Sequence, residues 1–329
     1  MNRPAHFTRP VLALMVMLSL TAGVAQAQTK INAGWNLFSP EQDAEIGVQS
    51  ASEAERQLPI LRDAEVQNYV NRIGQRLAAN AGGPRFNYQF KVVNASDINA
   101  FALPGGYIYV NRGIIDNARN EGEVAGVLAH EISHVALRHG THQASKAYAA
   151  QAGLSILGGL LGGKVGQNTA SILNTVGGIG LNVLFLKFGR DLESQADVRG
   201  AQILAASGYT PQDMVSFFQT LSSVDKSKKT SFLSDHPAPP DRVARIQKEA
   251  KLLNVPANPT TNVAELDQIK GDLRRYGNAP TMADISRNAT AATAPQRSTN
   301  RSTTGAVVQV DPPSSTMRTY TSKSGVYRL

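Results

Sequence analysis

Residues 121–142 read EGEVAGVLAHEISHVALRHGTH, and residues 130–134 within them form the pattern H-E-x-x-H. Apolar residues recur at helical spacing through this stretch, which predicts a helix with a buried apolar face. Histidines four residues apart project from one side of a helix, so the rings of His130 and His134 can meet on one metal ion. Glu131 lies between them. The stretch therefore predicts the outline of a zinc site on a packed helix.

Length and composition limit the kind of protein that carries this helix. The chain has 329 residues, of which 42% are hydrophobic, enough for one large domain or two modest ones with a real core. It has no cysteine, so any metal must be bound by His, Asp or Glu. The formal charge is +8, yet residues 28–255 carry 22 basic and 20 acidic residues. Because no basic stripe with interleaved aromatic residues is present, we expect no nucleic-acid binding.

The first 27 residues have the features of a secretory signal peptide. Arg3 and Arg9 precede an apolar run, and Ala25-Gln26-Ala27 has the small-x-small pattern of a cleavage site. The apolar run, residues 11–22, is short for a membrane span. We therefore expect an exported protein that is cleaved after Ala27, with an uncleaved membrane anchor as the alternative.

The rest of the chain is expected to be mainly helical. Apolar periodicity, caps and glycine or proline breaks predict helices over about 39–57, 63–79, 190–206, 211–221 and 241–253, and strands over 86–93 and 107–110. The stretch NAFALPGG, residues 99–106, lies between the two strands and ends in turn chemistry. The strand that adjoins this turn either offers a free edge to an extended peptide or forms an ordinary hairpin beside the core. The sequence leaves both alternatives open.

A hydrolytic zinc site needs three protein ligands and one open position. A third histidine in the extended pattern is excluded, because that pattern needs Gly and His where the chain has Leu137 and Gly140. His139 falls out of register. With Arg138, it is predicted to cap the C-terminus of the helix, where cations are favoured.

The third ligand is expected from ESQAD, residues 193–197, on a later helix. Glu193 and Asp197 are four residues apart and share a helix face. Glu193 can complete the zinc site while Asp197 hydrogen-bonds a ligating imidazole, and a solvated acidic face is the alternative. Glu131 would then take a proton from the attacking water and deliver it to the leaving amine.

His236, in the turn Asp235-His236-Pro237, is the remaining candidate for the site. Three roles stay open for it. It could be a fourth metal ligand that keeps an enzyme latent, or a donor to the tetrahedral oxyanion, for which Arg242 is the alternative. It could also be a turn histidine that is hydrogen-bonded to the backbone.

Two segments outside this framework carry weaker signals. Residues 154–188 are apolar and glycine-rich, which fits packed helices joined by a flexible loop, a mobile lid, or a surface that touches membrane or unfolded client. Residues 256–329 are rich in Ser, Thr and Pro, and we expect a largely disordered tail, with a brief helix over 263–276, disorder from about 279 and a potential strand at 306–310. This basic tail, or residues 154–188, could contact a membrane peripherally.

Taken together, the HEISH and ESQAD motifs, the NAFALPGG stretch and the Asp235–Pro237 turn resemble those of the M48 peptidases, and are similar to the bacterial periplasmic members and to the Ste24 and HtpX groups. The resemblance covers about residues 38–253. It implies an α+β fold, mainly α with a small β-sheet, of gluzincin type, and one zinc ion bound by His130, His134 and Glu193. It also implies Glu131 as the catalytic base and a proton-donor role for Asp197.

The resemblance further implies a function and an arrangement of domains. We expect a signal peptide at 1–27, a metallopeptidase domain at 28–255 and the tail at 256–329. The expected activity is that of a periplasmic zinc endopeptidase whose substrates are unfolded or misassembled envelope proteins, with outer-membrane contact as an added expectation. A non-catalytic protein that binds clients as a chaperone is the alternative.

Overall fold

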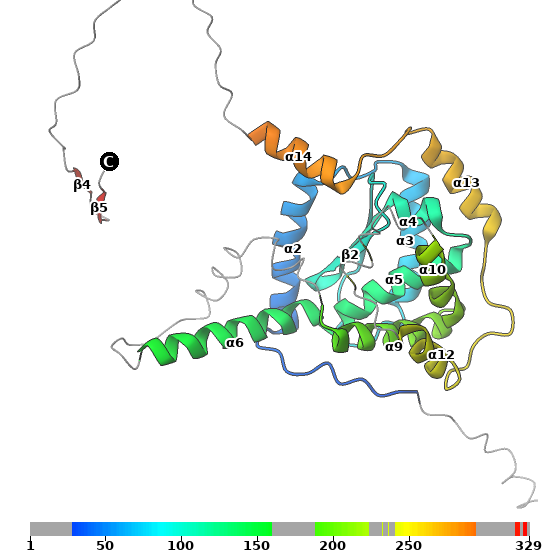
Figure 1. The fold of residues 1–329 in the computed structure, drawn as a ribbon, viewed down its shortest axis with the longest axis horizontal. Coiled ribbons are helices and arrows are strands. Elements are labelled where there is room, and N and C mark those ends of the chain that lie inside the picture. Colours follow the sequence, from blue (N-terminus) through cyan, green and yellow to red (C-terminus); the bar gives the residue numbers. More distant parts are fainter. Residues whose placement is uncertain are drawn as a thin grey trace, which may run out of the picture. The chain divides into compact units, whose positions relative to one another are not determined.

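Figure 1 shows the fold in the computed structural model, which describes residues 28–159, 188–223, 232, 236, 241–293, 320–322 and 325–327. The chain divides into two compact units, residues 1–291 and 292–329. In its described part, the second unit is an antiparallel hairpin of β4 (Tyr320–Ser322) and β5 (Gly325–Tyr327). The predicted signal peptide at 1–27, most of the apolar stretch 154–188 and the predicted strand at 306–310 lie outside the described residues.

A small mixed sheet lies inside the first unit. Its strand order is β1-β3-β2, where β1 (Gln89–Val93) runs parallel and β2 (Ala100–Leu103) antiparallel to the central β3 (Tyr107–Asn111). The prediction missed β2 as a separate strand because its four residues run directly into a Pro-Gly-Gly turn. That turn needs glycine: Gly105 has a φ of +76°, and a Cβ there would lie 2.7 Å from the Cα of Ala44.

Helices cover both faces of the sheet. On one face, α3 (Ala64–Ala78) and α5 (Glu121–Ala136) pack apolar side chains against alternate strand residues in the main core. On the other face, α2 (Pro40–Gln57) contributes Ala51 and Ala54 to a second apolar cluster. The start of α2 is set by Ser39, whose side chain accepts from the backbone of Gln42 in a capping box. The predicted mainly helical α+β fold is confirmed.

The central helix of the unit is α5. The sheet, α3, α9 (Arg190–Ala206) and α10 (Pro211–Ser223) enclose it. At its C-terminal end it also contacts α6 (His139–Gly159). Every residue from Glu121 to Ala136 is buried, so the expected single apolar face understates the packing. Small residues permit it, since a Cβ on Gly126 would lie 2.9 Å from the Cα of Met214 on α10. Helices surrounded on all sides must be apolar or have paired polar groups.

The chain turns sharply where α5 ends. Leu137 and Arg138 separate α5 from α6 (His139–Gly159), and Arg138 takes a left-handed conformation with a φ of 59°. The Arg138 guanidinium binds both carboxylate oxygens of Asp43, at 2.6 and 3.1 Å, and the carbonyl oxygen of Phe38. The expected capping of α5 by Arg138 and His139 is therefore wrong: Arg138 is drawn to α2, and His139 starts a new helix.

The first unit extends past residue 255. The predicted helix near 263–276 is confirmed as α13 (Val263–Arg274), whose apolar residues join the main core. A further helix, α14 (Met282–Thr293), occupies part of the stretch expected to be disordered from about 279. Met282 and Ile285 pack against the second apolar cluster, and the backbone N–H of Met282 donates to Asp97. Two apolar anchors in a polar sequence were too weak a signal for this helix.

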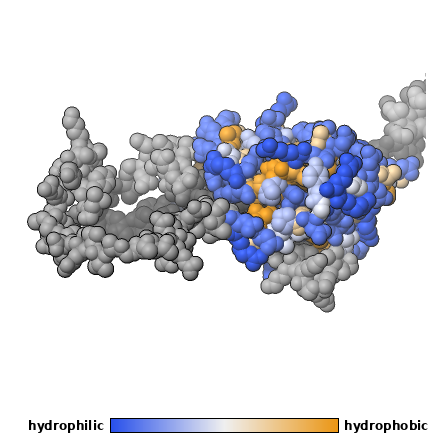
Figure 2. All heavy atoms as spheres, turned by 90° about the horizontal axis from the view of Figure 1, so that it is seen from above, coloured by the Kyte–Doolittle hydropathy of each residue, from blue (hydrophilic) through white to orange (hydrophobic). Residues whose placement is uncertain are grey.

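The described surface on the face seen in Figure 2 is largely hydrophilic, with apolar residues gathered near its middle. Five large apolar side chains are exposed among the described residues, and they are scattered along the chain: Trp35, Leu37, Val48, Val263 and Tyr276. Within the same part of the chain, no helix has both the length and the hydrophobicity needed to cross a membrane.

The last helix next to the site is α12 (Arg242–Ala250), which packs against α9 and α10.

Candidate metal centre

The centre is built on the C-terminal half of α5. Nε2 of His130 and Nε2 of His134 lie 3.1 Å apart, and both rings are buried. Four residues are about one helical turn, so both side chains leave the helix on the same side. The pairing that the sequence predicts is therefore present in the fold.

α9 supplies the carboxylate. Glu193, in the first turn of α9, has Oε2 3.3 Å from Nε2 of His130 and Oε1 3.5 Å from Nε2 of His134. Close packing of the two helices brings these groups together: a Cβ on Gly200 of α9 would lie 3.4 Å from the backbone nitrogen of His130. The structure thus brings together the three residues that the sequence singled out as ligands.

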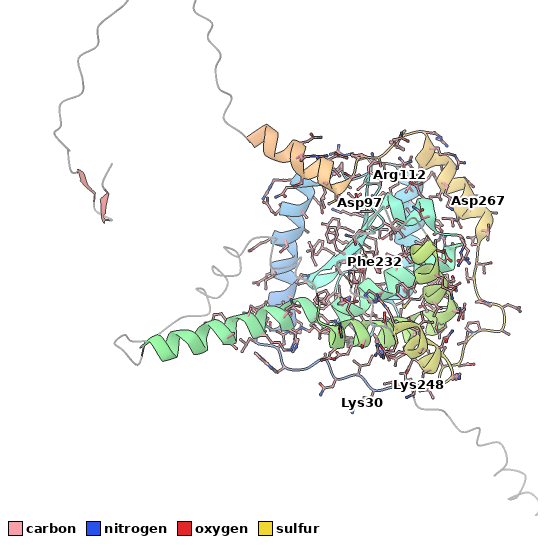
Figure 3. The ribbon with its side chains drawn as sticks, viewed as in Figure 1. Lys30, Asp97, Arg112, Phe232, Lys248 and Asp267 are labelled. Carbon is pink, nitrogen blue, oxygen red and sulfur yellow. The ribbon has the colours of Figure 1, made fainter. Side chains whose placement is uncertain are left out.

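His236 joins the same group from the segment between α10 and α12. Its Nδ1 lies 3.3 Å from Nε2 of His130 and 3.0 Å from Oε1 of Glu193. The ring stacks on Phe232, with centroids 4.7 Å apart, and the backbone N–H of His236 donates to the Phe232 carbonyl. Figure 3 shows Phe232 well inside the unit, and it is fully buried. One nitrogen or oxygen from each of His130, His134, Glu193 and His236 lies within 4.8 Å of all the others.

These separations fit a tetrahedrally bound ion. Zinc held at about 2.0–2.1 Å by each ligand places neighbouring ligand atoms about 3.3 Å apart. The five contacts within the group measure 3.0 to 3.5 Å. Oε2 of Glu193 is buried without a well-aligned hydrogen bond from a described residue, although Nε2 of His130 lies 3.3 Å and Nη2 of Arg242 3.6 Å from it. A cation bound at the centre of the group would satisfy this oxygen. Three imidazoles and a carboxylate suit zinc and related divalent metals.

A buried ion pair supports His130 from behind. Oδ1 of Asp197 lies 3.1 Å from Nδ1 of His130, on the ring edge opposite the ligand group. Arg242 reaches the same oxygen, with Nε at 2.9 Å and Nη2 at 2.7 Å, and its guanidinium lies 4.0 Å above the ring of Phe218. Asp197 therefore lies beside the imidazole of a candidate ligand, as the sequence predicts. Arg242, which the sequence offered as an alternative oxyanion donor, forms an ion pair with Asp197.

Glu131 lies beside the group and is buried. Its Oε1 is 3.5 Å from Nε2 of His236 and accepts no hydrogen bond from a described residue. Burial raises the pKa of Glu131, and the charges of His236 and His130 oppose that rise. A carboxylate with a raised pKa can hold a proton near neutral pH, which suits a group that accepts and returns protons.

The charges of the group set the other ionisation states. Burial alone would raise the pKa of Glu193, but hydrogen bonds from His130 and His236 outweigh it and lower that pKa. For His134, burial dominates and lowers the pKa well below its ordinary value. Glu193 is thus ionised and His134 neutral, as metal ligation requires. For His130, burial and the charge of Arg242 lower the pKa, but hydrogen bonds to Asp197 and Glu193 outweigh them and raise it, so a metal ion would displace a proton there.

His139 is a site residue that sequence reasoning missed. It is fully buried, its Nδ1 lies 3.0 Å from Nδ1 of His134, and its Nε2 lies 3.3 Å from Oε1 of Gln195 on α9. Burial lowers its pKa to about 4. The turn at Arg138 places His139 there, and no local signal announces a left-handed arginine. The only available hint was that His139 follows His134 by five residues, a spacing that a continuous helix would put off the ligand face.

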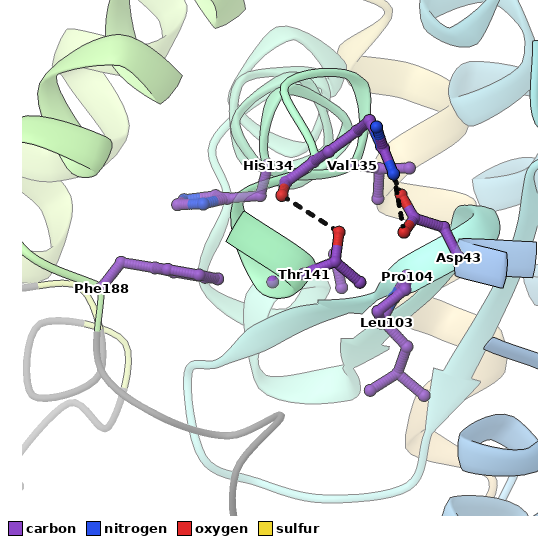
Figure 4. Close-up of a pocket in the computed structure, with 10 residues that line it drawn as sticks. Asp43, Leu103, Pro104, His134, Val135, Thr141 and Phe188 are labelled. Carbon is purple, nitrogen blue, oxygen red and sulfur yellow. Dashed lines mark hydrogen bonds and ion pairs between the residues drawn. The ribbon is translucent and has the colours of Figure 1, made fainter. Parts of the chain in front are cut away.

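A hollow flanks the metal centre next to the edge of the sheet (Figure 4). Leu103 and Pro104 line one side of it, His134 and Val135 another, and Phe188 covers His134 with ring centroids 4.1 Å apart. Among the described strands, β2 is paired on one side only. The sequence left a hairpin and a free strand edge as alternatives, and both are present. β2 and β3 form the hairpin, and the outer strand is β2.

Comparison with known proteins places this arrangement in a family. A 32% identical stretch of 219 residues is shared with the beta-barrel assembly-enhancing protease of Yersinia pestis, covering 65% of this chain and 45% of that protein. The metalloproteases YcaL and LoiP of Escherichia coli are 33% and 30% identical and are covered over 66% and 71% of their lengths. This chain thus spans less than half of the first relative. The profile of peptidase family M48 matches residues 64–250, which hold the whole metal centre, and the chain belongs to that family.

Proposed function

We propose that this chain is a zinc-dependent endopeptidase that hydrolyses peptide bonds in unfolded or misassembled proteins of the bacterial envelope. The observation that carries the proposal is the convergence of His130, His134 and Glu193 from two helices, with the carboxylate of Glu131 buried beside them. Binding a metal for structure alone would not call for an extra buried carboxylate whose Oε1 accepts no hydrogen bond from a described residue.

The proposed chemistry divides the work among these residues. Bound zinc would polarise the scissile carbonyl group and lower the pKa of a water molecule toward neutrality. Glu131 takes the proton from the attacking water and passes it to the leaving amine. Asp197 holds the ring of His130 through Nδ1, so that Nε2 faces the ligand group. Its ion pair with Arg242 holds Asp197 in place for that task, and a proton-donor role for Asp197 follows from the family resemblance.

The edge of the sheet supports a polypeptide substrate. β2 lies against α5, and its outer edge can add the backbone hydrogen bonds of one extended chain. The hollow lined by Leu103, Pro104, Val135 and Phe188 lies beside His134, within reach of a side chain of that peptide. Since a folded protein does not present an extended backbone, unfolded segments are the proposed substrates. The name of the Yersinia pestis relative supports a place in the envelope, as does the expected signal peptide.

His236 is proposed to keep the enzyme latent. Its Nδ1 lies within 3.3 Å of both His130 and Glu193, where a fourth ligand would fill the position that a hydrolytic site leaves open. Besides these contacts, the ring stacks on Phe232 and the backbone N–H of His236 donates to the Phe232 carbonyl.

A comparison of wild type with Glu131→Gln tests the proposal. Each purified protein is mixed with an unfolded polypeptide, and both the rate of cleavage and the bound zinc are measured. We expect at least a ~100-fold loss of rate with zinc retained, because general-base catalysis contributes about that factor or more. Glu45→Gln, at an exposed position of α2, is the matched control. Cleavage by Glu131→Gln at the wild-type rate would overturn the assignment of Glu131. Zinc-loaded wild type that binds but never cleaves polypeptide would favour the chaperone alternative.

A further inference from the structure

We propose that His139 is a positioning residue that fixes the proton of His134 on Nδ1 and thereby directs the Nε2 lone pair of His134 into the metal centre. This inference rests on the proposed function to the extent that His134 must bind a metal ion through Nε2. It assigns to His139 a purpose that neither the motif nor the family match contains.

The contact geometry comes first. Nδ1 of His139 lies 3.0 Å from Nδ1 of His134, a hydrogen-bond distance between two buried nitrogens. The rings meet edge to face, with centroids 5.0 Å apart and an interplanar angle of 77°. On the other side of His139, Nε2 lies 3.3 Å from Oε1 of Gln195. The side chains of His134, His139 and Gln195 thus form a line of contacts that runs from the ligand group to α9.

The number of protons on the two rings fixes which nitrogen donates and which accepts in each of these contacts. Two nitrogens in contact share one proton, so one ring must donate and the other must accept. If Nε2 of His134 gives its lone pair to a metal, the proton of the neutral ring sits on Nδ1 and is donated to His139. His139 then accepts at Nδ1 and carries its own proton on Nε2. That proton faces the carbonyl oxygen of the Gln195 amide, which can only accept.

The two ligating histidines are supported differently. His130 is backed by the carboxylate of Asp197, whereas His134 is backed by an uncharged ring. Glu131, Glu193 and Asp197 already place three carboxyl groups in a buried region where Arg242 is the permanent cation. A fourth carboxylate behind His134 would add a further desolvation cost. A neutral acceptor orients the ring without that cost.

The fold commits several features to this contact. Leu137 and Arg138 break the helix, and the Arg138 side chain holds that break against Asp43 and Phe38. α6 therefore begins at His139, and the His139 ring packs against His134 of α5. Gln195 lies on α9 between Glu193 and Asp197. The line of contacts therefore joins α5, α6 and α9 beside the metal centre.

Ring-nitrogen NMR of the zinc-loaded protein measures the proton positions directly. The chain has only six histidines, so labelled ring nitrogens can be assigned with single variants. We expect the proton of His134 on Nδ1 and that of His139 on Nε2. A proton on Nδ1 of His139 would overturn the inference. Wild type that binds no divalent metal at all would instead overturn the proposed function.

Zinc affinity, measured by competition with a chelator, tests the consequence. We expect His139→Leu to weaken zinc binding about 10- to 100-fold, the usual effect of losing such a supporting partner. His139→Asn keeps an acceptor atom close to the position of Nδ1 and should restore affinity to within about threefold of wild type, as a conservative rescue. Equal affinity of the leucine variant and wild type would contradict the inference while leaving the metal site intact.

Two further variants separate positioning from folding. His142→Leu is the matched control, because His142 is also buried on α6 but contacts the Trp35 carbonyl instead of a ligand, so zinc affinity should not change. Gln195→Met acts from a half-buried position and keeps the His134–His139 contact. It should weaken zinc binding severalfold, and it decides the matter if His139→Leu does not fold. Unchanged zinc affinity in folded Gln195→Met would overturn the inference that these contacts position His134.

Discussion

Nδ1 of His236 lies 3.0 Å from Oε1 of Glu193, although 43 positions separate the two residues in the chain. The contact places an imidazole on the side of the ligand group where a hydrolytic metal site keeps an open position. Under the proposed latency, the ring of His236 would fill that open position. The consequence can be tested by removing the ring.

We predict that His236→Ala raises peptidase activity severalfold with zinc retained, because the fourth position is freed while three ligands remain. The measurement is the initial rate of cleavage of an unfolded protein at matched zinc content, with His142→Ala as a control for the loss of a buried histidine. Unchanged activity would assign His236 to the turn alone. A loss of activity would instead favour its role as an oxyanion donor.

The Asp197–Arg242 pair should contribute strongly to stability. Both side chains are buried, and Arg242 also has a buried Nη1 without a hydrogen bond from a described residue. Asp197→Asn removes the closer of two counter-charges and leaves Oε2 of Glu193 3.6 Å from Nη2. Breaking a buried pair costs about 3–5 kcal/mol, and the contact with Glu193 places the expected loss at the lower end of that range. We expect this decrease in the free energy of unfolding, measured with urea in the presence of a chelator so that metal binding does not contribute.

Asp191→Asn provides the comparison for that experiment. Asp191 is exposed in the first turn of the same helix, where an acidic residue contributes about 0.3–1 kcal/mol through the helix dipole. A free energy of unfolding for Asp197→Asn within about 1 kcal/mol of this control would contradict the role given to the pair. The double variant Asp197→Ala with Arg242→Leu should recover part of the loss, because it removes both charges together.

Asp213 should make stability depend on pH at a distance from the metal centre. Its carboxyl group is buried against α5, where a Cβ on Gly122 would lie 2.4 Å from its Cγ. Burial raises the pKa of Asp213 from its ordinary value of 3.8 to about 6. The folded state therefore holds the proton more tightly than the unfolded state. This stabilisation is complete below pH 3.8 and is lost as the pH rises through about 6.

The expected size of that change is up to about 3 kcal/mol, since each pKa unit corresponds to 1.36 kcal/mol. Urea unfolding of wild type and Asp213→Asn between pH 4 and 8 isolates the effect, because all other titrating groups are common to both. The stability of wild type relative to Asp213→Asn should fall across this range and level off above pH 7. A difference that stays constant with pH would show that Asp213 titrates normally in the folded state.

Local patterns in the sequence were sufficient for most helices. Ser39 caps α2 and Asp63 caps α3 through side chains that accept from the backbone N–H three residues later, a relationship that is complete within one turn. β2, α14 and the break at Arg138 were not predicted. Each depends on a distant partner: the pairing with β3, the second apolar cluster and the carboxylate of Asp43.

The sequence by itself determined that His130 and His134 leave one side of a helix with Glu131 beside them, because helical geometry fixes neighbours one turn apart. It also nominated Glu193 and Asp197, because they share a face of one later helix. Only the tertiary structure decided that these two helices meet, that Arg242 pairs with Asp197, and that His139 and His236 turn toward the centre. These contacts join residues whose distances are set by how the helices pack and where the chain reverses, and no local spacing encodes those quantities.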